Sequence, residues 1–270
     1  MENKLYVNDG NFDTSNTMAY QLLVEVGKGF YAYCIVDEEG AIKAISYNKG
    51  DIQLANDISL LQLPYKKTFI SLPTSSFTFL PSQLYNKDDE PKYAQFLETN
   101  NHTIINTYTF LNNEVTALNT FNTDELIFIR SLFPSSKIFP PYLPLINCVH
   151  KLLANDLSPQ LTINFKSEKL EILIIDNGKL LFYNVFDALN ADEVLYYTLN
   201  ACQQNKLISK KINLNICGDI FENDAIYMQL AKYFGKISFM LNNNVKVLST
   251  EFEDIVWHQY FSLLNLSTCE

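Results

Sequence analysis

One order of elements occurs twice along the chain, and this repetition constrains the fold more than any other feature of the sequence. Each half contains three short apolar runs with an acidic turn after the second, then a helical stretch, then an apolar run preceded by Lys-Lys. Leu22 lies 15 positions before Asp37, at the turn of the first half. Leu161 lies the same 15 positions before Asp176, at the turn of the second. We therefore expect two related α/β units, with chance similarity of unrelated units as the alternative because identity between the halves is low.

The first half predicts a three-stranded meander followed by a helix and a fourth strand. The helix is expected over 51–63, where Ile52, Ala55, Ile58 and Leu61 recur at helical spacing, and the fourth strand over 66–73. The predicted strands of the meander are 20–26, 30–37 and 41–48.

The second half predicts the same succession, with a helix over 190–205 capped by Asn190 and a strand over 210–218. A helix over 223–235, strands over 236–240 and 245–249, and a helix over 251–264 are expected to complete this half. The predicted strands of its meander are 161–167, 169–176 and 178–186.

The segments between these units suggest a domain organisation. Residues 1–17 are polar and read as a flexible leader, and 18–140 and 141–270 are expected to form the first and second domains. An insertion at about 77–122 holds a short helix over 90–98 and strand-like residues over 103–118. A helix capped by Thr123 and a proline-rich linker lead into a helix that carries Leu145 and Leu152.

Composition excludes several functional classes. The net charge of -10 disfavours binding to nucleic acid, and the five scattered cysteines fit free thiols, buried or incidental, better than a metal site or a disulfide framework. The three histidines lack metal-ligand spacing, and His258 beside Trp257 suggests helix packing rather than catalysis. No secretory signal or membrane-length apolar run is visible, so we expect a soluble cytoplasmic protein without direct membrane insertion.

The stretch Gly27-Lys28-Gly29 sits between two predicted strands and allows two interpretations. It is a hairpin bend with a solvated lysine, or it retains a backbone contact with a phosphate group. The chain contains neither GxxxxGK[ST] nor GxGxxG, which rules out a P-loop or a Rossmann fingerprint.

Several motifs in order resemble the actin-like ATPase superfamily, nearest to its PilM-like and GspL-like members from pilus assembly and type II secretion. The resemblance rests on "VEVGKG", "FISLPTSSFTFLP", "LFPSSKIFPPYLPLI", "LTINFKSEKLEILIIDNGKLLFYNVF" and "LNICGDI", which together span about residues 20–261. It implies an α/β protein with a duplicated actin-like (ribonuclease H-like) fold. Two mixed-sheet domains would carry flanking helices, and a small subdomain would be inserted in the first.

The resemblance also implies a nucleotide site for Mg-ATP, whose first hairpin is partly preserved. Glu25 stands where the superfamily has Asp, Gly27 matches its glycine, and Lys28 and Gly29 complete the turn. Glutamate keeps the charge but is one methylene longer.

The rest of the implied site departs from the superfamily pattern. Asn164 takes the Asp position of the second hairpin and Lys166 its Gly position. In the adenosine motif Gly218 is retained, whereas Asp219 replaces the second glycine. A neutral amide cannot supply charge for Mg²⁺, and a side chain at the glycine position obstructs phosphate.

We therefore expect a degenerate nucleotide site with no catalytic residue, no metal and no cofactor. The favoured function is a non-catalytic cytoplasmic scaffold or adaptor that binds a protein partner. The alternative is an ATP-binding protein or slow ATPase that uses Mg-ATP through Glu25 and the backbone of Gly27 and Gly29. The sequence specifies neither the partner nor the oligomeric state.

Overall fold

The structure is a computed structural model that describes residues 4–241 and 244–269 and contains two compact units. Within the described residues, unit 1 comprises 4–147, 244–254 and 262–269, and unit 2 comprises 148–241 and 255–261.

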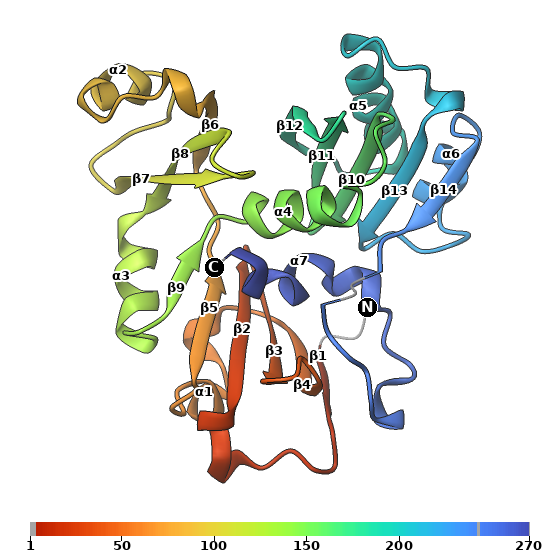
Figure 1. Ribbon diagram of the computed structural model, residues 1–270. Coiled ribbons are helices and arrows are strands. Elements are labelled where there is room, and N and C mark those ends of the chain that lie inside the picture. The colour runs from red at the N-terminus through yellow and green to blue at the C-terminus, as the bar shows by residue number, and fades with distance from the viewer. Residues whose placement is uncertain (1–3, 242–243, 270) are drawn as a thin grey trace. The chain divides into compact units, whose positions relative to one another are not determined.

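Unit 1 is built on a six-stranded mixed sheet in the order β1-β4-β3-β2-β5-β9 (Figure 1). Neighbouring strands from β1 to β2 are antiparallel, whereas β5 and β9 run parallel to β2. The predicted meander and the strand after it are confirmed as β2 to β5. The strands of this sheet are β1 (Lys4–Asn8), β2 (Tyr20–Gly27), β3 (Phe30–Asp37), β4 (Ile42–Lys49), β5 (Lys67–Ser71) and β9 (Lys137–Phe139).

One face of this sheet packs against α1 (Ile58–Leu61) and α3 (Thr123–Leu132). Alternate residues of β2 and β3, such as Leu22 and Tyr33, are fully buried in this core together with Ile129 of α3. The N-cap of α3 is Asn122, whose side chain accepts a hydrogen bond from the Glu125 backbone, so the prediction of Thr123 as the cap was wrong by one residue.

The single helix predicted over 51–63 is wrong. The segment forms a 3-10 turn, η2 (Ile52–Leu54), and the one-turn helix α1, separated by Ala55 in an extended conformation. Asn56 and Asp57 favour a turn after Ala55, and Pro64 disfavours helix in the residue before it. The apolar spacing was real, because Ile52 and Leu61 are both buried, but local turn residues divided the helix.

The insertion forms a separate three-stranded antiparallel sheet in the order β6-β8-β7. Its strands are β6 (Ser76–Pro81), β7 (Thr103–Phe110) and β8 (Val115–Asn122), close to the predicted limits of 77–122. The predicted helix over 90–98 is confirmed in part as α2 (Glu90–Ala94), with Pro91 in its first turn. Two 3-10 turns, η3 (Ser82–Leu84) and η4 (Lys87–Asp89), precede α2.

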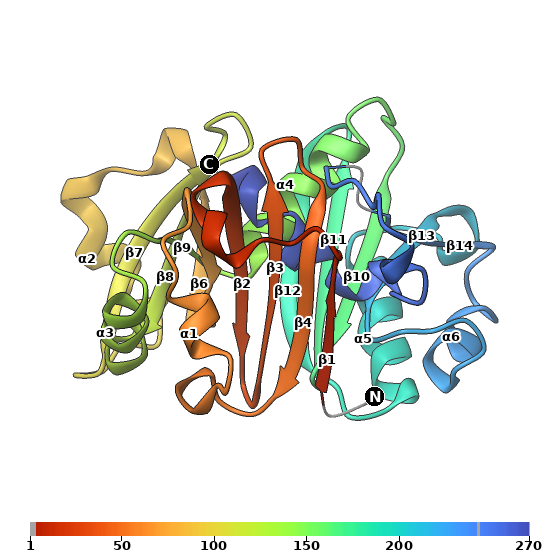
Figure 2. The same cartoon turned by 90° about the horizontal axis from the view of Figure 1, so that it is seen from below.

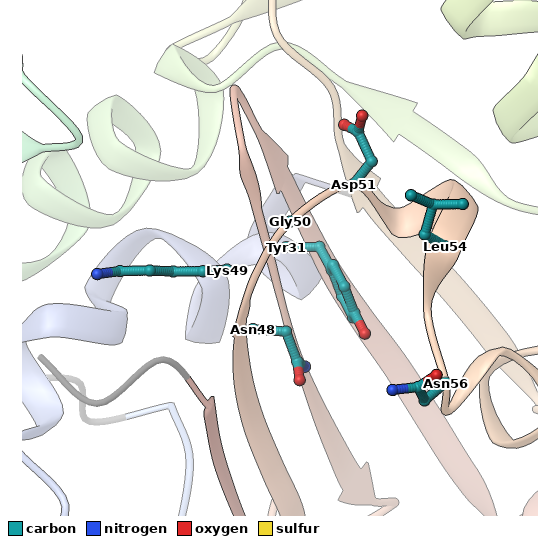
Figure 3. Close-up of a pocket in the computed structure, with 7 residues that line it drawn as sticks. All are labelled: Tyr31, Asn48, Lys49, Gly50, Asp51, Leu54 and Asn56. Atoms are coloured by element: carbon teal, nitrogen blue, oxygen red, sulfur yellow. The ribbon is translucent and has the colours of Figure 1, made fainter.

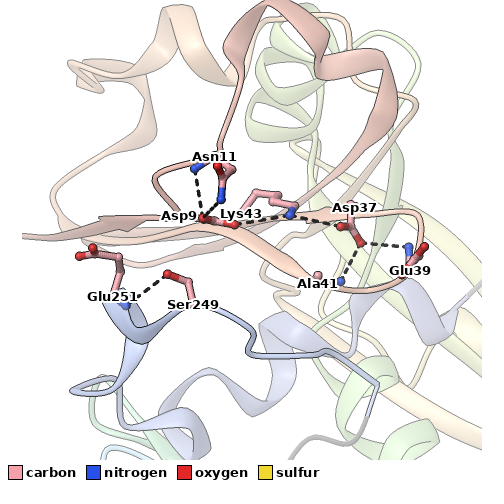
Figure 4. A network of polar contacts seen from close by, with 8 residues as sticks. All are labelled: Asp9, Asn11, Asp37, Glu39, Ala41, Lys43, Ser249 and Glu251. Atoms are coloured by element: carbon pink, nitrogen blue, oxygen red, sulfur yellow. Dashed lines mark hydrogen bonds and ion pairs between the residues drawn. The ribbon is translucent and has the colours of Figure 1, made fainter.

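The prediction of a flexible leader over 1–17 is wrong for the described residues. β1 pairs antiparallel with the edge of β4, as Figure 2 shows, and η1 (Thr14–Ala19) follows it. Lys43 bridges Asp9 and Asp37 at 3.5 and 3.4 Å, and the Asp9 carboxylate accepts a hydrogen bond from the Asn11 backbone (Figure 4). Polar residues therefore attach this segment to the sheet, and residues 1–3 lie outside the described part.

The prediction that 141–270 forms one domain is also wrong, because the chain returns to unit 1 after 243. Lys246 forms an isolated β-bridge with Ala41, and the Asn244 amide donates a hydrogen bond to Asn265. The segments that return include η6 (Thr250–Phe252) and η8 (Leu266–Cys269). Ser249 is the N-cap of η6, and its hydroxyl accepts a hydrogen bond from the Glu251 backbone (Figure 4). Composition alone could not reveal this return, since it depends on contacts with residues far away in sequence.

Unit 2 is built on a five-stranded mixed sheet in the order β12-β11-β10-β13-β14 (Figure 1). Strands β10, β11 and β12 are antiparallel, and β13 and β14 run parallel to β10. The same order and directions hold for β4-β3-β2-β5-β9 in unit 1. The strands are β10 (Gln160–Lys166), β11 (Lys169–Asp176), β12 (Lys179–Asp187), β13 (Asn213–Gly218) and β14 (Lys236–Phe239).

One face of this second sheet packs against α5 (Ala191–Gln204) and α6 (Ala225–Leu230). Asn190 caps α5 as predicted, because its side chain accepts a hydrogen bond from the Glu193 backbone at 3.0 Å. The predicted Lys-Lys strand begins only at Asn213, after the 3-10 turn η5 (Ser209–Lys211).

Three further predictions for the second half need correction. The helix expected over 223–235 is limited to α6, and 245–249 contributes the isolated bridge at Lys246 rather than a strand. The helix expected over 251–264 is divided into η6, η7 (Trp257–Tyr260) and α7 (Phe261–Leu264). Residues 251–254 and 262–264 of this segment belong to unit 1, and 255–261 belong to unit 2.

The predicted helix after the proline-rich linker is confirmed as α4 (Tyr142–Leu152), which begins in unit 1 and continues into unit 2. Within the part of the chain that the structure describes, no helix is both long and apolar enough to cross a membrane.

Candidate functional site

The first candidate site is the tip of the β2–β3 hairpin. Gly27 and Phe30 form its last pair, and Lys28 and Gly29 make an exposed two-residue turn in which Gly29 has a φ of 74°. The Gly29 carbonyl accepts a hydrogen bond from the Gly50 backbone at 2.8 Å. The hairpin-bend interpretation of this stretch is confirmed, and a phosphate contact stays a prediction.

Gly27 is explained by packing inside the hairpin. A β-carbon at this position would lie 1.9 Å from the ring of Phe30, which is itself buried and stacked on Tyr47 with ring centroids 5.7 Å apart. The space that the glycine leaves is therefore filled by a phenyl ring of the same hairpin.

Glu25, the acidic residue of the predicted site in the first hairpin, is only 8% exposed. It stands two residues before the last pair of the hairpin, opposite Ala32 on β3 and beside Ser71 on β5. Unit 1 therefore holds one carboxylate close to the hairpin tip.

The second candidate site is the β10–β11 hairpin of unit 2. Lys166 and Lys169 form its last pair, and Ser167 and Glu168 make the turn with φ values of 49° and 65°. Counted from the turn, Lys166 corresponds to Gly27 and Asn164 to Glu25. The register of the two hairpins thus agrees with the correspondence that we read from the sequence.

Asn164 is 6% exposed and belongs to a hydrogen-bonded group inside unit 2. Its side-chain amide donates to the carboxylate of Glu171, which stands directly opposite it on β11. Tyr183 on β12 donates its hydroxyl to the other oxygen of Glu171. Sequence reasoning missed Glu171 and Tyr183, although counting residues back from the hairpin turn places Glu171 opposite Asn164.

Gly218 ends β13 next to the same hairpin and cannot be replaced without a clash. Its φ is 82°, and a β-carbon would lie 2.2 Å from the Phe165 carbonyl oxygen and 2.5 Å from the Asn164 side-chain oxygen. The backbone of Asp219 donates to the same Phe165 carbonyl at 2.6 Å, and its carboxylate accepts from Gln259 at 3.2 Å. The absence of a β-carbon at Gly218 therefore allows β13 to approach β10 closely.

The residues at the predicted positions of unit 2 are an amide, a lysine and an aspartate. The Asn164 amide is bonded to Glu171, Lys166 belongs to the last pair of the hairpin, and Asp219 follows Gly218. The expectation that these residues do not serve Mg-ATP stays a prediction. Among the described residues there is no group of three or more His, Cys, Asp or Glu side chains arranged to hold a metal ion.

A pocket of about 310 Å³, which the sequence did not predict, lies in unit 1 beside the first hairpin. It is formed where β3 and β4 meet the loop to η2, and Tyr31 and Asn48 face each other across these strands (Figure 3). Burial, together with a 2.7 Å hydrogen bond to Asp57, raises the pKa of the Tyr31 hydroxyl, so this phenol stays protonated. The lining residues are Tyr31, Asn48, Lys49, Gly50, Asp51, Leu54 and Asn56.

His258 and four of the five cysteines are buried. His258 is buried between Phe221 and Phe239 and bonds to the Ile220 carbonyl, which confirms packing although the long helix is absent. Burial lowers the pKa of His258 and raises the pKa of the Cys34 thiol. All five cysteines are free; four are buried and Cys269 is half-buried.

Comparison with solved structures identifies the class of protein. A protein of unknown function from Bacteroides thetaiotaomicron VPI-5482 with an actin-like ATPase fold superposes with a TM-score of 0.75 at 18% identity, covering 97% of this chain and 100% of that one. A chain of a PilM-PilN type IV pilus biogenesis complex superposes with a TM-score of 0.59 at 10% identity, covering 92% and 98%. The protein therefore has the actin-like fold, as the resemblance implied.

Within this class, the chain belongs to the DUF3822 family of proteins of unknown function, which matches residues 9–237. No curated protein matches the chain.

Proposed function

We propose that this protein is a non-catalytic member of the actin-like fold that acts as a scaffold or adaptor for a protein partner. One observation carries the proposal: the positions that would serve a nucleotide are already used by the protein itself. Phe30 fills the space at Gly27, and the Phe165 carbonyl and Asn164 side chain fill the space at Gly218. These glycines are thus accounted for by packing, without a nucleotide.

The chemistry of the second hairpin supports the same proposal. Asn164 supplies no negative charge for Mg²⁺, and its amide is engaged by Glu171. Phosphoryl transfer depends on charge neutralisation by positioned groups, so the loss of one carboxylate and one open glycine removes much of what a catalyst needs. A pseudo-ATPase that descends from an internal duplication explains both these losses and the matching strand order of the two sheets.

The partner is proposed to be a protein. The solved PilM structure is a complex with PilN, so one similar protein of this fold assembles with a protein partner. The inserted segment of this chain carries three exposed large apolar side chains, Leu84, Phe96 and Ile104. The net charge of -10 disfavours a nucleic acid, and we place the protein in the cytoplasm.

The alternative is an ATP-binding protein or slow ATPase, and two observations favour it. Glu25 keeps a buried carboxylate near the first hairpin, and the space around Gly29 is open, with no atom within 4 Å of a β-carbon there. Mg-ATP would then bind through Glu25 and the backbone of the hairpin tip, with little help from unit 2.

Thermal unfolding with and without millimolar Mg-ATP separates the two functions. A nucleotide at a hundredfold excess over its Kd would stabilise the protein by about 2.7 kcal/mol. The scaffold proposal expects no change in melting temperature. A rise that disappears in the isosteric Glu25→Gln variant would overturn the scaffold proposal and support ATP binding.

The partner proposal is tested by photo-crosslinking in the native cell. A photoreactive amino acid at Phe96 is expected to trap one specific protein, whereas the same group at the exposed surface residue Glu253 serves as the matched control. The trapped protein must also bind the purified chain and lose affinity when Phe96 is changed to Asp. Equal, non-specific trapping at both positions would argue against the inserted segment as the docking site.

A further inference from the structure

Strand β12 forms an outer edge of the sheet in unit 2, and within the described part of the chain no strand pairs with that edge (Figure 1). In unit 1 the corresponding edge, on β4, is covered by β1. The described residues of unit 2 hold no counterpart of β1, because α4 leads into β10 through residues 153–159, which form turns and no strand. A long open edge such as β12, with nine residues, offers a row of backbone groups to another strand.

The backbone of alternate residues in β12 points out of the sheet. The Ala188 amide, just after the strand, donates to the carbonyl of Glu168 in the neighbouring hairpin, which indicates that even-numbered residues face β11. The Val185 amide instead donates to the side chain of its own neighbour, Asn184, at 2.9 Å. By the same alternation, the backbone groups of Tyr183 lie along the outer edge together with those of Val185.

Apolar side chains adjoin this edge. Leu181 on β12 and Leu189, which follows the strand, are both exposed. Phe186 of β12 stacks on Tyr197 of α5 with ring centroids 4.5 Å apart, and Tyr197 meets the exposed Tyr196 edge-on at 5.3 Å. A partner that covers the edge would therefore bury apolar surface as well as backbone groups.

The charges at the two ends of β12 are complementary to each other. Lys179 begins the strand, Asp187 ends it, and Tyr183 is its midpoint. A second β12, antiparallel and related by a twofold axis at Tyr183, brings Lys179 of each copy close to Asp187 of the other. The β-bulge at Leu181 shifts Lys179 by one position, which its long side chain spans. Asp187 already pairs with Lys169 of its own chain, and a carboxylate accepts from more than one donor.

We propose that β12 pairs antiparallel with β12 of a second copy of this chain, so that the two sheets of unit 2 join into one. The second copy supplies the covering strand that unit 1 obtains from its own β1. A parallel copy in register would instead place like charges opposite one another at both ends. Because the same residues meet from both sides, the assembly closes as a dimer. The proposal does not depend on the scaffold function or on the inserted segment.

The first test is sedimentation equilibrium of the purified full chain between about 1 and 500 µM, where we expect a reversible equilibrium of monomer and dimer. Val185→Pro removes an N–H group from the outer edge, a position at which a strand tolerates proline. This variant should dimerise at least about tenfold more weakly, with circular dichroism and melting temperature as the check on its fold. A wild-type chain that stays monomeric at about 500 µM would overturn the proposal and leave the edge to a different partner.

A pair of charge variants locates the interface without any change to the backbone. Lys179→Glu and Asp187→Lys each place like charges together at both ends, so each alone should dimerise about tenfold more weakly than the wild type. An equal mixture of the two restores opposite charges at both ends and should form a heterodimer close to wild-type affinity. Lys236→Glu makes the same charge change on β14, at the other edge of the sheet, and should dimerise like the wild type.

Three results of this comparison would overturn the proposal. They are a dimer that neither charge variant weakens, a mixture that associates no more tightly than its components, and a loss in Lys236→Glu equal to that in Lys179→Glu.

Discussion

Asn164 donates a hydrogen bond from its side-chain amide to Glu171, and Asn164 occupies the position in unit 2 that corresponds to Glu25 in unit 1. The interaction makes Asn164 part of a hydrogen-bonded group within the sheet. Glu171 also accepts from Tyr183, so three adjacent strands share the group.

Replacing the amide by a carboxylate with Asn164→Asp should destabilise the protein by about 2 kcal/mol at pH 7, because a donor to Glu171 becomes a like charge. Repulsion raises the pKa of the carboxyl pair in the folded state above its unfolded value. The folded variant then holds more protons than the unfolded chain, so its stability is highest at acid pH and falls as pH rises. Urea unfolding at pH 4.5 and pH 7 measures this pH dependence, with Asn184→Asp at an exposed position as the control. A stability difference between Asn164→Asp and wild type that does not change with pH would contradict the prediction.

Gly218→Ala should be far more costly than Gly29→Ala. Both glycines have positive φ, but a β-carbon at Gly218 meets the Phe165 carbonyl at 2.2 Å and one at Gly29 meets nothing. We expect a loss of about 1 kcal/mol at Gly29 from the backbone conformation alone, and a loss above about 3 kcal/mol at Gly218. Chemical denaturation of the two variants compares them directly, and similar losses would show that the close approach at β13 is not required.

Gly27→Ala should destabilise the first hairpin by about 1–3 kcal/mol, because the new methyl group overlaps the Phe30 ring. Reducing the ring with Phe30→Leu should recover part of this loss, so the double variant is more stable than the sum of the single changes predicts. A double-mutant cycle by urea unfolding measures the coupling. Strict additivity would mean that Gly27 has another role at the tip, such as the phosphate contact of the alternative function.

His258 should make stability depend on pH between about 7 and 5. Burial lowers its pKa below the ordinary value of about 6.5, so the unfolded chain takes up a proton in this range before the folded protein does. The contribution of neutral His258 to stability is therefore fully present above pH 6.5. It is lost as pH falls, by an amount on the order of 1 kcal/mol. His258→Gln should flatten this part of the profile, whereas the exposed His102→Gln should keep the slope of the wild type.

Much of the candidate site could be placed from the sequence because hairpins obey a strict register. The two-residue turns fix which residues pair. The sequence therefore places Glu25 at the same position as Asn164, and Gly27 at the same position as Lys166, in the two hairpins. The partners of these residues were less accessible. Phe30 folding over Gly27 depends on a side-chain conformation, which the pattern of apolar residues does not specify.

The sequence by itself determined the two strand meanders, the helix after the second, the inserted segment and the amide side chain at Asn164. These features rest on local periodicity, turn residues and chemical identity, which neighbouring residues in the chain suffice to define. Tertiary structure alone decided that β1 covers the edge of β4, that the chain returns to unit 1 at Asn244, and that Asn48 faces a pocket. Such features depend on contacts between residues far apart in sequence, whose free energy appears only when the packed sheet brings them together.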